Sequence, residues 1–287
     1  MPALSEMQRN EVEGITAHSC GRQFSSHERF QGIGPINLKH ADGVEDWRPR
    51  RLPYLNQPEP PSIPVKQPAI LPESHVARLA HVVDQSWIIL KSRFLSGRNP
   101  IQLEAPFQHY FAHVLASYGQ LCCVERRDQF LVDLERRMPG NAAGREYLDI
   151  CCSFAGTDAS CAIELKFKTN RQGAQDHGRI DAYQDLDALE RACQSEFSFG
   201  RFFMITDSTP YIRKSKHGVG TVFATHDGHH AVSGAAVHYP SSKGRENVKL
   251  TLRNSYVFSW EKVGEWYFLE MHVPRPPCAR EPKSSPA

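Results

Sequence analysis

The sequence predicts an α/β domain in which helices flank a mixed β-sheet. Three observations support this fold class: two amphipathic helical patterns come first, strands of alternating polarity follow, and a third helical pattern precedes another strand. The expected order is helix, helix, strand, strand, strand, helix, strand, followed by further short β-like runs.

The composition is that of an ordinary globular protein. The 287 residues carry a formal net charge of +2, so a polyanion site would have to come from local clusters of charge. No apolar run approaches the roughly 20 residues that span a bilayer, and the first residues lack the apolar core of a signal peptide. We therefore predict a cytoplasmic protein with no membrane partner.

Proline is frequent on both sides of the predicted folded domain. It is dense between residues 48 and 68, which excludes a continuous helix or a central strand there. Residues 1–70 are therefore expected to form a largely irregular, proline-rich arm and linker. Residues 276–287 are rich in proline and charge and are predicted to be a disordered tail. The folded domain is expected to occupy residues 71–275.

Two helices open this domain. Apolar residues at three- and four-residue steps predict the first helix from Ser74 to Gly97. The second is expected to start near Glu104, because Pro106 is tolerated only in a first turn, and to stop at Gly119.

Strands and one further helix fill the rest of the domain. We expect a strand at residues 121–127 and then a polar connection up to Arg145. A third helix is predicted at 179–194 and a strand at 201–208. The remaining β-like runs are residues 220–225, 231–239 and 248–253 and an aromatic hairpin at 256–273.

The runs YLDICCSF and CAIELKFK each place charge inside an apolar strand. Side chains alternate faces along a strand, so Asp149 lies opposite the apolar face that holds Leu148 and Ile150, and Glu164 and Lys166 share one face of the second run. A tight hairpin through the connecting AGTD would set Asp149 across from Glu164.

Two such carboxylates repel each other unless a cation lies between them. A few hard oxygen ligands suit Mg²⁺ or Mn²⁺, and Lys166 beside them could polarise a water or offset charge on a phosphoryl oxygen. A metal, a positioned water and a lysine can together hydrolyse a phosphodiester. The alternative is a cross-strand ion pair on an exposed sheet face, which the flanking helices disfavour.

These residues resemble the motif of the PD-(D/E)xK nuclease superfamily, which has the restriction-endonuclease-like fold. The resemblance implies that Asp149, Glu164 and the Leu165 carbonyl bind the metal, and that Lys166 activates water or stabilises the transition state. Glu104 is similar to a glutamate that many members aim at the metal from their first core helix. An acid favouring the helix dipole is the alternative for Glu104.

The resemblance covers a nuclease-like core at residues 99–207, followed by a β-rich extension at 208–275. Leu148 replaces the proline of the motif. Some members use polar residues of the third helix on the substrate backbone, and the candidates for that role here are Arg179, Asp181, Tyr183 and Gln184.

Basic residues could extend this site along a phosphate backbone. Lys168 and Arg171 follow the proposed metal ligands, and Lys214 and Lys216 lie in a predicted loop. A solvated charged loop is the ordinary alternative for each pair.

The leading hypothesis is a divalent-metal-dependent DNA endonuclease of prokaryotic restriction, defence or repair, and a homodimer is compatible with it. A catalytically inactive nucleic-acid- or protein-binding module on the same fold is the alternative from another class. An RNA-cleaving, toxin-like nuclease would share the chemistry and differ in substrate.

Overall fold

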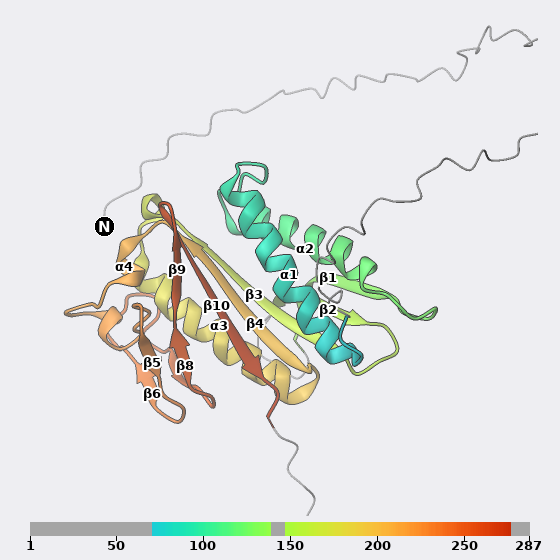
Figure 1. The fold of residues 1–287 in the computed structure, drawn as a ribbon. Coiled ribbons are helices and arrows are strands. Elements are labelled where there is room, and N and C mark those ends of the chain that lie inside the picture. The colour runs from blue at the N-terminus through green and yellow to red at the C-terminus, as the bar shows by residue number, and fades with distance from the viewer. Residues whose placement is uncertain (1–70, 139–146, 277–287) are drawn as a thin grey trace, which may run out of the picture. The chain divides into compact units, whose positions relative to one another are not determined.

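The computed structural model describes residues 71–138 and 147–276. The predicted arm at 1–70 and the predicted tail beyond Pro276 lie outside these residues. The described part is an α/β structure with a mixed sheet flanked by helices, which confirms the predicted fold class at that level (Figure 1). None of its helices has both the length and the apolar character needed to cross a bilayer.

Four helices and ten strands make up the described chain. The helices are α1 (His75–Leu95), α2 (Glu104–Leu121), α3 (Gln175–Ser195) and the single turn α4 (Thr209–Ile212). The central sheet contains, in spatial order, β1 (Phe130–Arg137), β2 (Tyr147–Phe154), β3 (Ser160–Lys168), β4 (Phe199–Thr206), β10 (Trp266–Pro274) and β9 (Trp260–Val263). Two small ribbons pair β5 (His229–Ala231) with β8 (Tyr256–Phe258) and β6 (Ala236–His238) with β7 (Lys249–Thr251).

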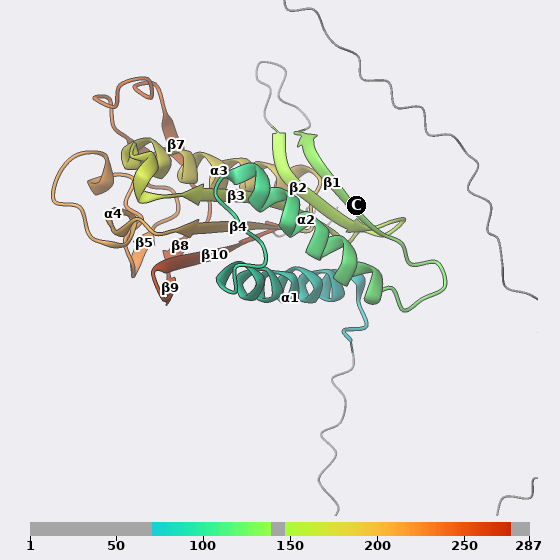
Figure 2. The ribbon, with the colours of Figure 1, turned by 90° about the horizontal axis from the view of Figure 1, so that it is seen from above.

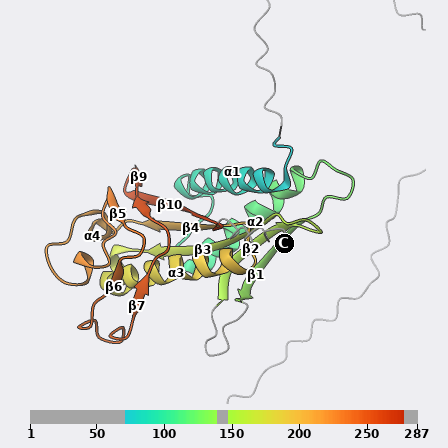
Figure 3. The same ribbon diagram turned by 90° about the horizontal axis from the view of Figure 1, so that it is seen from below.

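The sheet is mixed because one of its connections is a helical crossover. Strands β1, β2 and β3 form an antiparallel meander, whereas β3 and β4 are parallel and α3 links them. Parallel neighbours need such a crossover, because a hairpin can join only antiparallel strands. Helices α1 and α2 cover one face of the sheet and α3 covers the other (Figures 2 and 3).

A separate hydrophobic core lies on each face. Trp87 of α1 is central to the first core, where its ring lies 4.7 Å from that of Phe203 and 5.9 Å from that of Phe111. The second core packs α3 against the sheet and the C-terminal ribbons, with Tyr183 stacked on Phe258. Strand β3 is therefore buried on both faces, and the charged side chains of Glu164 and Lys166 lie in the interior.

The helix starts follow the sequence closely. Ser74 caps α1 by accepting a hydrogen bond from the Ala77 N–H, and α2 begins at Glu104 with Pro106 in its first turn. The predicted stop at Gly119 is wrong, because α2 continues to Leu121. Gly119 is required instead by packing, since a Cβ there would lie 2.2 Å from the Phe130 ring.

The predicted strand at 121–127 is also wrong. Its first residue ends α2, and the following residues turn around Asp128, whose carboxylate accepts hydrogen bonds from the Val124 and Glu125 N–H groups. Arg78 of α1 fixes that carboxylate from 2.8 Å. The strand that precedes β2 is β1, within the segment expected to be a polar connection.

The C-terminal region contributes to the central sheet. The predicted aromatic hairpin at 256–273 forms in part: β9 and β10 turn around Gly264 and β10 pairs along the whole length of β4, whereas Tyr256–Phe258 form β8 and pair with β5. Two of the six central strands thus come from residues 208–275. The expected strand at 220–225 is wrong: this segment begins with a 3₁₀ turn, where the Arg179 side chain packs on Gly220.

Replacing Gly119 by alanine should lower the free energy of unfolding by about 1–3 kcal/mol, because the added methyl group overlaps the Phe130 ring. Urea denaturation measures this change. The same substitution in a Phe130→Leu background should cost clearly less, and an equal cost in both backgrounds would contradict the packing explanation.

Candidate active site

Asp149 lies at an interruption in the pairing of β2 with β1 and just beyond the end of its pairing with β3. The pairing with β1 skips Glu135 and Asp149, and Glu135 has a positive φ of 51°. The pairing with β3 ends at Ile150 and Ile163. Asp149 is held there by two other bonds: its carbonyl accepts a hydrogen bond from Gln108 Nε2 at 2.7 Å, and its carboxylate accepts one from the Leu165 N–H at 2.7 Å.

This irregularity also changes the alternation of side chains along β2. Leu148, expected on the same face as Ile150, belongs to the second core, whereas Ile150 belongs to the first. Glu135 accepts a hydrogen bond from the same Gln108 amide. An unusual backbone conformation that the surrounding residues hold in place is often found at a functional site.

Asp149 and Glu164, the two acids of the predicted hairpin, line the same cavity. The pairing of β2 with β3 stops one residue before them, at Ile150 and Ile163. Burial raises the pKa of Asp149, against the lowering effect of Lys166. Burial, together with Asp185 and Asp149, raises the pKa of Glu164 well above its ordinary value.

Lys166 joins β3 to the helices on both sides of the sheet. Its Nζ lies 3.1 Å from Glu104 Oε1 of α2 and 2.8 Å from Asp185 Oδ2 of α3, and it donates a hydrogen bond to the Leu165 carbonyl at 3.3 Å. Burial lowers the pKa of Lys166, but Asp185, Glu104 and Glu164 raise it by more. Lys166 is therefore held protonated.

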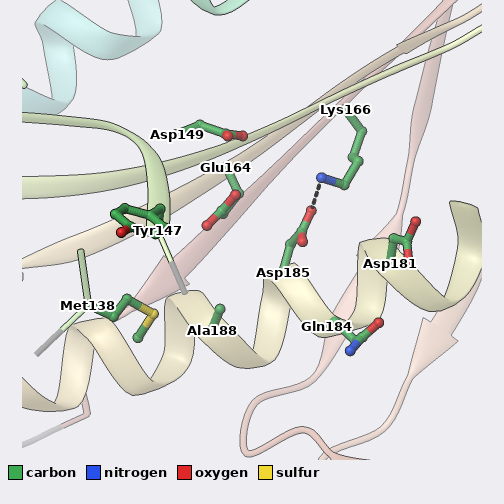
Figure 4. Close-up of a pocket in the computed structure, with 9 residues that line it drawn as sticks. All are labelled: Met138, Tyr147, Asp149, Glu164, Lys166, Asp181, Gln184, Asp185 and Ala188. Atoms are coloured by element: carbon green, nitrogen blue, oxygen red, sulfur yellow. Dashed lines mark ion pairs between the residues drawn. The ribbon is translucent and has the colours of Figure 1, made fainter. Parts of the chain in front are cut away.

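A cavity of about 330 Å³ opens beside these groups (Figure 4). Its lining joins Asp149, Glu164 and Lys166 to the face of α3 that bears Asp181, Gln184, Asp185 and Ala188. These four positions follow the three- and four-residue steps of one helix face. Asp185 was missed from the sequence, although its spacing from Asp181 on a helix was the available signal.

Two predicted substrate contacts on α3, Arg179 and Tyr183, do not line this cavity. Tyr183 is buried and donates its hydroxyl hydrogen to the Ala224 carbonyl at 2.8 Å. Arg179 is buried, hydrogen-bonds the Pro210 carbonyl and lies 3.5 Å from Asp176. Neither side chain is available to a substrate backbone, so we withdraw that role for both.

The other predicted contacts are accessible. Lys168 ends β3 and its Nζ lies 3.8 Å from Glu104 Oε2, while Arg171 is exposed in the 3₁₀ turn Asn170–Gln172 that follows. Lys214 and Lys216 are exposed in the loop after α4 and do not line the cavity.

The cavity contains residues that could supply oxygen ligands to a cation, although among the described residues a group of three ligating side chains close enough to share one ion is found at His75, Glu125 and Asp128 and not here. Asp149, Glu164 and Asp185 bring three carboxyl groups to the cavity lining, and the Leu165 carbonyl accepts a hydrogen bond from Lys166 beside them. Asp185 Oδ2 is shielded from solvent and makes no hydrogen bond of good geometry, although Lys166 Nζ is close to it. Several carboxyl groups with raised pKa values around one cavity are typical of sites that bind a cation.

A second group of metal-binding residue types lies apart from this cavity. The ligating atoms of His75, Glu125 and Asp128 lie within 4.8 Å of one another. Both Asp128 oxygens are already engaged, by His75 at 2.9 Å and by Arg78 at 2.8 Å. Burial opposes the ionised form of Asp128, yet its backbone hydrogen bonds, His75 and Arg78 lower its pKa to about 2. A cation would have to displace this arginine, so we interpret the group as an ion-pair cluster that fixes the turn.

Glu164→Gln should stabilise the metal-free protein at neutral and alkaline pH. A carboxyl group whose pKa is raised by folding binds more protons in the native state, so stability falls as pH rises through that range. We expect the variant to exceed the wild type in free energy of unfolding by about 1–3 kcal/mol near pH 8, with the difference shrinking towards pH 5. Denaturation in EDTA measures it, with the exposed Glu265→Gln as control. A pH-independent difference would contradict the electrostatic cause.

Comparison with known proteins returned no significant similarity: no family model matches the chain, and no match was found among curated proteins or solved structures.

Proposed function

We propose that this protein is a divalent-metal-dependent nuclease of PD-(D/E)xK type that hydrolyses DNA phosphodiester bonds. The observation that carries the proposal is the convergence of Asp149, Glu164 and Lys166 beside an open cavity, with Glu104 of α2 joined to the same lysine. The element order supports it as well, since a helix and a strand precede the two motif-bearing strands, as in the restriction-endonuclease-like fold.

Asp149, Glu164 and the Leu165 carbonyl would hold Mg²⁺ or Mn²⁺, with Asp185 as a further carboxylate within the cavity. Such an ion supplies Lewis acidity to a phosphoryl oxygen and lowers the pKa of a bound water. The protein contributes the fixed geometry: Gln108 and the Leu165 N–H hold Asp149, and β3 presents Glu164 and Lys166 on one face.

The charge of Lys166 selects between the two roles that the motif implies. A lysine that acts as a general base must give up its proton near neutral pH, whereas the pKa of Lys166 is raised by Asp185, Glu104 and Glu164 after the opposing effect of burial. We therefore assign Lys166 to the cationic role, in which it orients the attacking water and offsets charge on the phosphoryl group.

Supercoiled plasmid should be nicked in Mg²⁺ or Mn²⁺ and remain intact in EDTA. Asp149→Ala should reduce cleavage at least a hundredfold, because one carboxylate of the pair is lost. Agarose electrophoresis over time measures the rates. Intact plasmid with every preparation, together with no Mn²⁺ binding by calorimetry, would favour the inactive binding module, and cleavage of RNA alone would favour the toxin-like alternative.

Lys166→Ala should lower the cleavage rate about a hundredfold or more while changing Mn²⁺ affinity by only a few fold, because the lysine faces the reacting phosphate and does not ligate the ion. Calorimetry and single-turnover cleavage measure the two effects. The exposed Lys249→Ala makes the same change in charge away from the cavity. Equal losses of affinity and rate would show that Lys166 is needed to build the metal site.

A further inference from the structure

A second cavity, of about 550 Å³, lies at the end of β3 on the face that α1 and α2 cover. Its lining combines an aromatic wall with a polar rim. The wall is Phe94, Phe167 and Trp266, and the rim includes Asn99, Gln102, Thr169, Arg171 and Asp207. Its volume lies in the range of cavities that take small organic ligands.

The aromatic wall is rigid and partly open. The Trp266 ring lies 4.8 Å from Phe94 in an edge-on arrangement and 5.7 Å from Phe167. Phe94 and Phe167 are buried, whereas Trp266 is only partly buried and borders the cavity. A tryptophan held in place in this way offers a flat surface on which another ring can stack at little cost in side-chain entropy.

The rim is polar, and hydrogen bonds hold the side chains of two of its residues, Asn99 and Asp207. Asn99 is buried, and its Oδ1 accepts hydrogen bonds from Arg93 Nε and Nη2, which fixes the orientation of the amide. Asp207 Oδ1 accepts a hydrogen bond from the Asn170 N–H. The rim thus presents side-chain amides, a hydroxyl group and a carboxylate around the aromatic wall, with the cation of Arg171 among them.

This cavity adjoins the candidate active site. Phe167 of the wall stands between Lys166 and Lys168 on β3, so the cavity and the active site occupy opposite faces of one strand end. Gln102 of the rim comes two residues before Glu104, whose carboxylate pairs with both lysines. Arg171 lines this cavity together with Trp266, so a phosphate bound at Arg171 would lie beside the aromatic wall.

We propose that this cavity binds an unpaired nucleobase of the substrate strand, stacked on Trp266 and hydrogen-bonded at the rim. The inference rests on the proposed nuclease function and adds to it that the enzyme recognises a base out of the duplex, at a cavity on the opposite face of β3 from the catalytic residues. Aromatic stacking is tolerant of sequence because every base has a π-face. Stacking on the aromatic wall would therefore contribute affinity for any base, and hydrogen bonds at the rim would distinguish one base from another.

Binding without cleavage tests this inference separately from the nuclease activity. The probes are a short oligodeoxythymidylate and an abasic oligomer with the same number of phosphates, titrated in EDTA against the full chain. The wild type should prefer the base-bearing oligomer by about fivefold to a hundredfold, the range expected for one stacked base. Trp266→Leu should lose that preference and Trp266→Phe should keep most of it. Tyr267→Leu, next on the same strand but facing the other side of the sheet, should behave as the wild type.

The fluorescence of Trp266 gives a second reading that does not depend on the leucine variant folding. Oligodeoxythymidylate should quench the emission of the wild type, the abasic oligomer should not, and Trp266→Phe should remove the quenching. Equal affinity of the wild type for both oligomers, or a preference that survives in Trp266→Leu, would overturn the inference. Metal-dependent plasmid cleavage in the same preparation would show that the nuclease proposal stands even then.

Discussion

The ammonium group of Lys166 is the interaction on which the arrangement of this domain depends. It lies in the interior of the central sheet, where an unpaired charge would be strongly unfavourable. Glu104 of α2 and Asp185 of α3 approach it from opposite faces of the sheet, so one cation fixes both helical layers relative to β3. Such a buried cluster contributes geometry more than net stability, because desolvation opposes the Coulomb attraction.

The acids around Lys166 outnumber the cations next to them. Glu104, Asp149, Glu164 and Asp185 share Lys166, with Lys168 at the edge, and burial raises the pKa of Asp185 to about 7 in spite of its ion pair. Excess negative charge in a sheltered place is costly for folding and useful for binding a cation. The excess of acidic groups therefore lowers the stability of the folded protein and favours the binding of a cation, as is common at functional sites.

The part of the site carried by the hairpin could be read from the sequence because its register is local. The turn between β2 and β3 sets Ile150 opposite Ile163, which brings Asp149 and Glu164 to the adjacent positions, and alternation then places Lys166 on the same face as Glu164. Asp185 could not be found in this way, since α3 is buried on much of its surface and its phase against the sheet follows from packing. The predicted helix stop at Gly119 and the predicted strand at 121–127 are wrong for a similar reason, because Gly119 is needed for packing against Phe130 and the turn after α2 depends on Arg78 of α1.

The irregular backbone around Asp149 makes the position of this residue depend on α2 and β3. A strand residue normally takes its position from its ladder bonds, whereas Asp149 takes its position from Gln108 and from the Leu165 N–H. Both of these groups belong to elements that also carry site residues, since α2 begins with Glu104 and Leu165 lies between Glu164 and Lys166. The carboxylate is thus oriented by the same two elements that bring its partners, so the acids and the lysine are positioned together before any substrate arrives. The entropy lost in ordering these side chains is therefore lost during folding and not during the reaction. Under that condition fixed charges stabilise a transition state effectively.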